Sequence, residues 1–416
     1  MRETVAQAMA VCILLTVSAC AQSLGSALEP TRYAHSGVVP QVRVDPEIIR
    51  FPVIDGADIR FSHLTPAQAP SQTRISQIIQ DDQGFLWFGT QEGLNRFDGY
   101  RCKVFTHDPS RPDSFGGSFV YSLFKDRSGS IWVGSEQSFD RFDPPTESFA
   151  HFHIDSRDPI VIHISQDNSG TLWLSTEIGL YRLNPQNGEV IRFGHHEDDP
   201  YSLSSDEIES TGEDSAGNFW VGTGVGMDRF DRNTGKVNLH VPLPELVPGS
   251  LCAAACRSFH EDHFGVFWIL YGGRNAAAIL DLKGNRLTKI SLYEGQTPGV
   301  IMQTEMNSVL EDHNGVMWFG TMGEGLLKFD RTHRKFIRYR NNPEDPESPV
   351  ENRVISLFED REGNVWTGFH AAIPDFFANE ESPFRVFKPA LADRLNAGEN
   401  LVNAIYEDRS GNVWMG

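Results

Sequence analysis

The sequence has 416 residues, of which 39% are hydrophobic and 22% are charged, a balance that excludes disordered and collagen-like chains. Its formal net charge is −20, from 36 basic and 56 acidic residues. A surface that acidic repels the phosphate backbone, so we expect no nucleic-acid partner.

Residues 1–23 have the pattern of an export signal. Arg2 supplies a positive charge, residues 8–19 form a mostly apolar run, and residues 19–21 (ACA) offer a cleavage site. The run is shorter than the roughly 20 apolar residues that a bilayer-spanning helix needs. The same stretch also resembles a lipobox, so a lipid anchor at Cys20 is an alternative. In both cases we expect the remaining chain to be periplasmic.

A repeat organises the rest of the chain. The pattern Asp-x-x-Gly-x-x-Trp occurs eight times, and its tryptophans are all those of the sequence: Trp87, Trp132, Trp173, Trp220, Trp268, Trp318, Trp366 and Trp414. Successive tryptophans lie 41 to 50 residues apart, the length of four short strands with their turns. This period is typical of a β-propeller blade.

Each residue of the pattern has a structural reason. The aspartate can accept hydrogen bonds from the backbone of its own turn, and the glycine supplies a positive φ. The tryptophan then lies on the second strand of a hairpin, where its ring can fill the space between adjacent sheets. A third and a fourth strand follow, as in residues 325–330 and 336–339. We therefore predict an all-β fold built of four-stranded antiparallel blades.

The order of the strands predicts how the ring closes. Residues 59–63 look like a fourth strand lying before the first motif, and they can complete a seventh blade that otherwise has three. After a linker at 24–57, we expect a seven-bladed β-propeller at 58–380. Residues 381–416 start the pattern again and are predicted to begin a second propeller. A single ring of eight blades is the alternative.

Three runs of the sequence resemble the two-component regulator propeller repeats: FSHLT at 61–65, GFLWFGTQEGLNRFDGY at 84–100 and DPYSLS at 199–204. The resemblance extends over residues 58–416. It implies two consecutive seven-bladed rings on the periplasmic side of a membrane receptor, followed by a β-sandwich, a transmembrane helix and a histidine kinase or a diguanylate cyclase. It also implies oligosaccharide ligands in some members. No residue here matches a kinase phosphoacceptor or nucleotide-binding motif, so kinase activity would belong to a longer parent chain.

Two repeats depart from the pattern and supply the candidate ligand-binding residues. In the fifth repeat the small pair after the tryptophan is replaced by Leu270 and Tyr271, and Arg274 and Asn275 follow. In the seventh repeat His370 occupies the corresponding loop. Together they offer the aromatic platform and hydrogen-bond donors that a sugar needs. The alternative is ordinary drift in degenerate repeats.

A possible metal set, Cys252, Cys256, His260 and His263, has suggestive spacing. Alignment of the repeats places His260 in a strand and His263 in a turn, which favours buried thiols and a turn histidine. The Asp-x-x-Gly turns lack the spaced ligands of a calcium loop. We therefore expect neither a metal nor a cofactor.

These observations favour a non-catalytic, ligand-sensing module of a two-component signal-transduction receptor. Its small-molecule or oligosaccharide ligand would shift the arrangement of two rings, or of two protomers in a homodimer, and the membrane-coupled output would respond. The alternatives are the input domain of a diguanylate cyclase, a secreted or lipid-anchored scaffold that binds proteins, and a propeller lyase or glycan-active enzyme. An enzyme would need histidines, glutamates or arginines that converge on one end of the channel.

Overall fold

The computed structural model describes residues 39–243, 255–272, 277–294, 304–378, 405–407 and 413–415. The chain divides into two units, one ending at Asn379 and one comprising residues 380–416. All regular elements of the described residues are β-strands, so the predicted all-β class is confirmed. Within these ranges, no helix has the length and apolar character that crossing a bilayer requires.

All but one of the strands of the first unit form four-stranded antiparallel sets, which we number as blades 1 to 7 in chain order. Blades 1 to 4 are separate sheets: β3 (Ile75–Gln80), β4 (Leu86–Thr90), β5 (Gly93–Phe97), β6 (Cys102–Phe105); β7 (Val120–Lys125), β8 (Ile131–Ser135), β9 (Phe139–Asp143), β10 (Ser148–Phe152); β11 (Val161–Gln166), β12 (Leu172–Thr176), β13 (Gly179–Leu183), β14 (Val190–Phe193); β15 (Ile208–Glu213), β16 (Phe219–Thr223), β17 (Gly226–Asp231), β18 (Lys236–Pro242).

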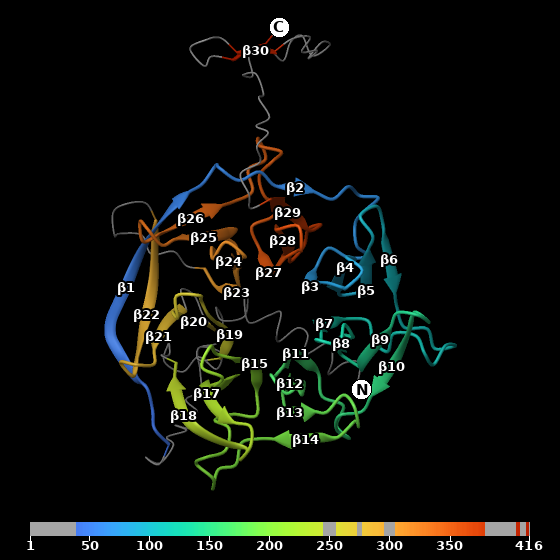
Figure 1. Ribbon diagram of the computed structural model, residues 1–416, viewed down its shortest axis with the longest axis vertical. Helices are drawn as coiled ribbons and strands as arrows, with labels where there is room; N and C mark the ends of the chain where they lie inside the picture. Colours follow the sequence, from blue (N-terminus) through green and yellow to red (C-terminus); the bar gives the residue numbers. More distant parts are fainter. Residues whose placement is uncertain are drawn as a thin grey trace, which may run out of the picture. The chain divides into compact units, whose positions relative to one another are not determined.

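Blades 5 and 6 belong to one larger sheet, and blade 7 combines strands from both ends of the unit. Their strands are β19 (Cys256–Glu261), β20 (Phe267–Tyr271), β21 (Ala277–Asp281), β22 (Arg286–Glu294); β23 (Met306–Glu311), β24 (Met317–Thr321), β25 (Leu326–Asp330), β26 (Lys335–Tyr339); β27 (Val354–Glu359), β28 (Asn364–Phe369), β29 (Asp375–Ala378) and β2 (Ser62–His63). The blades follow one another around a common centre, with the first strand of each blade innermost (Figure 1).

The predicted closure of the ring is present. β2 pairs antiparallel with β29, with Ser62 opposite Phe376 and His63 opposite Asp375. The strand is shorter than the predicted 59–63, but Phe61 just before it is buried against Phe377. β2 therefore supplies the fourth strand of blade 7, and the edge of β29 is paired and not exposed.

Part of the expected linker is instead a strand. β1 (Arg43–Asp55) pairs parallel with β22 and with β26, so it lies between the outer strands of blades 5 and 6. Figure 1 shows β1 running along the outside of the ring at this point. Phe51 and Val53 face inward and are 3% and 2% exposed. The prediction of a linker over 24–57 is thus wrong for this part, because β1 buries apolar side chains that a linker leaves in solvent.

The Asp-x-x-Gly turns form as predicted. Asp81 Oδ1 accepts hydrogen bonds from the backbone N–H groups of Gln83 and Phe85, each at 2.9 Å, and Gly84 has a φ of +94°. The other aspartate oxygen, Oδ2, accepts from the Trp87 indole at 2.8 Å. In all seven turns within the described ranges the indole donates to the aspartate in the same way, at 2.6 to 2.9 Å.

The tryptophans fill the space between neighbouring blades, as predicted. Trp87 of blade 1 packs against Phe142 of blade 2, with ring centroids 4.8 Å apart. Both belong to one buried cluster with Leu123 and Val133. The corresponding tryptophans of blades 2 to 6 are at most 1% exposed. Burying rings of this size contributes apolar stabilisation at these junctions.

Side chains next to the turns tie neighbouring blades together. In several blades the residue just before the aspartate accepts a hydrogen bond from the turn of the preceding blade, as Gln166 does from the Arg127 backbone, Glu359 from His313 and Gln80 from Arg361, at 2.8 to 2.9 Å. These bonds join blade 2 to blade 3, blade 6 to blade 7 and blade 7 to blade 1.

The second unit contains a described strand pair. β30 (Ile405–Glu407) and β31 (Val413–Met415) pair antiparallel, and β31 contains Trp414, the tryptophan of the eighth motif. The start of a second propeller at 381–416 remains a prediction, since most of that segment lies outside the described residues, as does the predicted export signal at 1–23.

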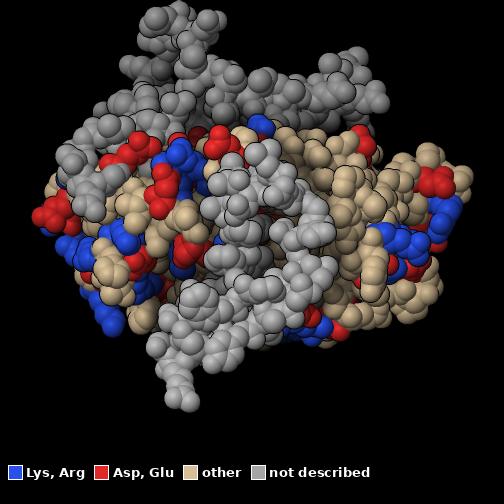
Figure 2. All heavy atoms as spheres, turned by 90° about the horizontal axis from the view of Figure 1, so that it is seen from above, with Lys and Arg blue, Asp and Glu red and all other residues tan. Residues whose placement is uncertain are grey.

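The surface carries both signs of charge. Figure 2 shows, on the face it presents, acidic and basic side chains interspersed over the described surface.

Candidate functional site

Three neighbouring inner strands begin side by side at one end of the ring. They are β27, β3 and β7 of blades 7, 1 and 2, which lie next to one another around the centre (Figure 1). Ser356 Oγ donates to the Ile75 carbonyl at 3.0 Å, and Ser76 Oγ donates to the Val120 carbonyl at 2.6 Å. These bonds fix the starts of the three strands relative to one another.

The residue before each of these strands belongs to one cluster. Arg353 precedes β27, Arg74 precedes β3 and Phe119 precedes β7. Tyr121 of β7 and His370, which directly follows β28, complete the group. We call these five residues the rim cluster.

Arg74 is at the centre of the rim cluster. Its Nη1 donates to His370 Nε2 at 3.1 Å, and its guanidinium carbon lies 5.6 Å from the centre of the Phe119 ring. The Phe119 and Tyr121 rings stack with centroids 4.3 Å apart and planes 29° apart. A chain of contacts thus runs from His370 of blade 7 through Arg74 of blade 1 to the Phe119 and Tyr121 rings of blade 2.

Backbone and carboxylate contacts hold the loop that carries His370. The His370 N–H donates to the Arg353 carbonyl at 3.0 Å, and the Ala371 N–H donates to Glu351 at 2.7 Å. The other Glu351 oxygen binds Arg353 Nε. Glu351 therefore offsets the charge of Arg353 and fixes the loop, while Arg74 has no carboxylate of its own among the described side chains.

The surroundings keep His370 neutral. Burial, and then the positive charges of Arg74 and Arg353, lower the pKa of His370 below its usual value. Arginine can only donate, so His370 accepts at Nε2 and its own proton resides on Nδ1. Burial likewise lowers the pKa of Arg74, and burial and Glu136 raise the pKa of Tyr121. At neutral pH the cluster holds cationic arginines, a neutral imidazole and a neutral phenol.

Of the candidates named from the sequence, His370 lies in this cluster. Tyr271, the last residue of β20, is 1% exposed and packs among the apolar residues between blades 4 and 5. That burial contradicts its expected role as an exposed aromatic platform, because its ring contributes to the core. Arg274 and Asn275 lie outside the described residues.

Sequence reasoning missed Arg74, Phe119, Tyr121 and Arg353. Their common signal is position: three of them stand one residue before the first strand of a blade, and the fourth stands one residue after its start. The residue at the position before the first strand is Arg74, Phe119, Ile160, Glu207, Ala255, Glu305 and Arg353 in blades 1 to 7. Charged residues therefore also occur there in blades 4 and 6, and the sequence alone does not single out blades 7, 1 and 2.

Cys256 and His260, two residues of the possible metal set, are not brought to one point. Cys256 begins β19 and His260 is its fifth residue, a separation of about 13 Å along an extended strand. His260 Nε2 lies 2.9 Å from Glu311, which also binds His263. Burial raises the pKa of the Cys256 thiol, which disfavours a metal-binding thiolate. Cys252 lies outside the described residues.

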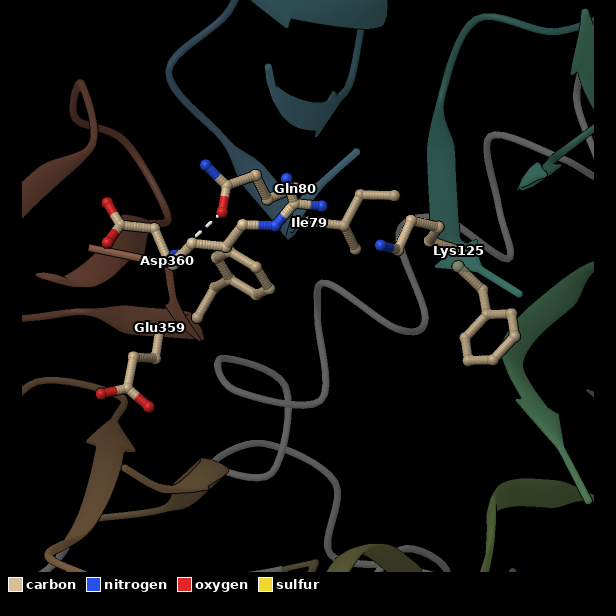
Figure 3. A pocket seen from close by; sticks show the side chains of 8 residues that line it. Ile79, Gln80, Lys125, Glu359 and Asp360 are labelled. Atoms are coloured by element: carbon tan, nitrogen blue, oxygen red, sulfur yellow. Dashed lines mark hydrogen bonds between the residues drawn. The ribbon is translucent and has the colours of Figure 1, made fainter. Parts of the chain in front are cut away.

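A hollow of about 360 Å³ lies at the opposite ends of the same three inner strands (Figure 3). It is lined by Ile79, Gln80, Phe124, Lys125, Phe358, Glu359, Asp360 and Arg361. Its cations are already engaged: Lys125 binds Asp82 at 2.8 Å, and Arg361 donates to the Asp82 carbonyl at 3.0 Å. The Arg361 N–H donates to Gln80, the bond drawn in Figure 3. This hollow is therefore a junction between blades.

Comparison with protein families identifies the repeats. The family model described as two component regulator propeller matches residues 69–92, 114–137 and 301–323, which confirms the resemblance noted from the sequence. A curated protein, histidine kinase P4 of Formosa agariphila, is 43% identical over 49 residues, which are 12% of this chain and 4% of that protein.

Solved structures share the fold. The extracellular domain of the putative hybrid two component system BT3049 from B. thetaiotaomicron superposes with a TM-score of 0.66 at 21% identity, covering 86% of this chain and 47% of that one. Virginiamycin B lyase from Staphylococcus aureus superposes with a TM-score of 0.56 at 12% identity, covering 77% of this chain and all of that one. The chain thus spans about half the length of the receptor domain. At these identities the likeness establishes a propeller fold.

Proposed function

We propose, from the two component regulator propeller repeats that this chain carries, that it forms the ligand-sensing part of an exported signal-transduction receptor. The observation that carries the proposal is the rim cluster, in which Arg74, Phe119 and His370 of different blades meet at one end of the ring. Propellers commonly bind small ligands at such an end, where loops from several blades meet. The extracellular receptor domain of the same fold supports a location outside the cytoplasm.

Signalling would follow from a ligand that spans blades. A molecule held by residues of blades 7, 1 and 2 ties these blades together, so it binds one arrangement of them more tightly than others. A second ring or a second copy of the chain could sense that shift. The kinase or cyclase output would belong to a longer protein, which the short match to a histidine kinase supports.

A ligand screen on the full chain tests the proposal. Thermal unfolding is recorded with glycans and periplasmic metabolites, for the wild type and for Arg74→Gln. A ligand present at 100 times its Kd stabilises the folded state by about 2.7 kcal/mol, and the variant should lose that gain. Absence of any stabilising compound, together with a protein partner recovered on an affinity column, would instead favour a binding scaffold.

The lyase alternative has less support from the site. His370 uses its Nε2 lone pair to accept from Arg74, and its other ring nitrogen carries the proton, so it has no free site with which to act as a base. The likeness to virginiamycin B lyase is one of fold. Turnover of any compound that stabilises the chain would revive the enzyme hypothesis.

A further inference from the structure

We propose that the rim cluster recognises a carboxylate attached to a ring, with the carboxylate on the Arg74 guanidinium and the ring against Phe119 and Tyr121. This inference rests on the proposed function and specifies its ligand class. Three features of the described residues carry it: the donors of Arg74 and His370 that have no partner, the lack of a carboxylate bonded to Arg74, and the stacked aromatic pair.

Arg74 retains the edge that carboxylates bind. A guanidinium presents two parallel N–H groups along the side formed by Nε and Nη2, and this fork matches the two oxygens of a carboxylate. His370 accepts from Nη1, which lies outside that edge. Nε is buried without a hydrogen-bond partner among the described residues. His370 thus orients the guanidinium while its carboxylate-binding edge stays unused.

The cluster has a shortage of acceptors. His370 Nδ1 is also buried without a described partner, and as the protonated nitrogen it is a donor. Buried donors without acceptors are rare, since each forfeits its hydration. Two such donors in contacting side chains indicate a ligand whose oxygen atoms can accept hydrogen bonds.

Arg74 lacks a carboxylate partner among the described side chains. Glu351 is bound to Arg353 and to the Ala371 N–H, and Glu136 accepts from the backbone N–H groups of Ser118 and Phe119. Neither carboxylate bonds to Arg74, whose described side-chain partner is the neutral imidazole of His370. A ligand carboxylate would give this guanidinium the partner that arginine commonly has when it is partly buried.

The aromatic pair selects a ring. Phe119 and Tyr121 are stacked on each other and both are partly exposed, so the parts of the rings that face away from the stack form an apolar surface near the guanidinium. A planar aromatic ring or the apolar face of a sugar can lie against such a surface. An aromatic acid and a sugar acid share this chemistry, and the experiment separates them.

The test uses two matched pairs of probes on the full chain. Benzoate is compared with benzamide and glucuronate with glucose, by NMR titration that detects Kd values up to about 10 mM. We expect an acid to bind at least ten times more tightly than its neutral partner. The pair that shows this identifies the source as an aromatic acid or a sugar acid.

Variants locate the binding. Arg74→Gln should abolish the preference for the acid, and Arg74→Lys should not restore it, because an ammonium lacks the fork. Arg127→Gln is the matched control: Arg127 lies in the turn at the other end of blade 2, and binding should be unchanged. Thermal unfolding of each variant without ligand shows whether it is folded.

The outcomes separate this inference from the proposed function. Equal affinity for acid and neutral probes, or an Arg74→Gln variant that keeps the preference, overturns the carboxylate inference. If the broad screen finds a neutral ligand that depends on the rim cluster and no acid binds, sensing stands and the ligand class is wrong. If nothing binds in either experiment, both proposals fall.

Discussion

At the scale of single residues, the aspartate of each repeat does more than cap a turn. Asp126 Oδ1 accepts from the N–H groups of Ser128 and Ser130, and Oδ2 accepts from the Trp132 indole at 2.8 Å. The turn-capping role followed from the sequence pattern. The indole bond did not, because it depends on how the tryptophan ring lies between two blades.

Asp126→Asn should destabilise the chain by about 2–3 kcal/mol, since one buried oxygen is replaced by an amide that cannot accept the indole hydrogen. Trp132→Phe is the companion variant, which removes the indole donor and keeps a ring in the core. Urea unfolding of both variants and of the double variant measures the coupling. Strictly additive effects would show that the Asp126–Trp132 bond contributes nothing.

A second residue-scale prediction concerns pH. Burial lowers the pKa of His163, near Thr211 of the next blade, to about 4. The unfolded chain takes up this proton near pH 6.5 and the folded chain resists it, so the stabilisation is present above pH 6.5 and lost as the pH falls toward 4. Relative to His163→Gln, the wild type should lose about 1–3 kcal/mol over that interval in urea unfolding. A constant difference between the two proteins would contradict the shift.

The rim cluster shows where residue-level prediction ends. His370 was identified because the residues that follow Trp366 depart from the repeat. Arg74, Phe119 and Arg353 stand at a position where the seven blades share no common residue. They can be identified as candidate site residues only from the structure, because the fold places the starts of β27, β3 and β7 side by side.

At the scale of elements, β2, which completes blade 7, could be predicted from the sequence. β1, which lies between blades 5 and 6, could not. Residues 59–63 precede the first motif by the distance at which a fourth strand precedes every later one. β1 carries Pro46 and Pro52, which argue against a strand because proline lacks the N–H that a ladder uses. It forms nevertheless, because two outer strands supply partners on both sides.

The closing strand should depend on protonation. Burial opposes the charge on His63, but the hydrogen bond at 2.6 Å and the negative charge of Asp375 outweigh it and raise the pKa of His63. Burial also raises the pKa of Asp375 to about 6. Both shifts make the folded state bind protons more tightly, so this contribution is present at low pH and lost as the pH rises.

Compared with His63→Gln, the wild type should therefore be more stable near pH 6 and lose that advantage by about pH 9. Urea unfolding at the two pH values measures the difference. His333→Gln is a suitable control, because His333 is exposed and its partner Asp330 lies three residues away on the same turn. An advantage that grows with pH would refute the proposed protonation of the pair.

At the scale of the whole molecule, one N-terminal segment holds the ring at two places. β2 completes blade 7, and β1 joins blades 5 and 6 into one sheet. The end of β1 is also tied by charge: Arg338 of β26, 5% exposed, binds Asp55 together with Glu294 and Glu324. Blades that would otherwise meet through side chains alone are therefore also joined by backbone hydrogen bonds.

If β1 joins blades 5 and 6 in this way, its buried side chains must contribute to the stability of the fold and its exposed side chains must not. Phe51, 3% exposed, meets Phe329 and Phe336 edge to face at 5.3 and 5.7 Å, so Phe51→Ala should cost about 3–5 kcal/mol. Ile48 on the same strand is 38% exposed, and Ile48→Ala should change stability by less than about 1 kcal/mol. Hydrogen exchange should accelerate in β22 and β26 of the Phe51 variant and stay unchanged in β29. Equal effects of the two variants, or faster exchange throughout the ring, would mean that β1 only covers the surface and does not join the two blades.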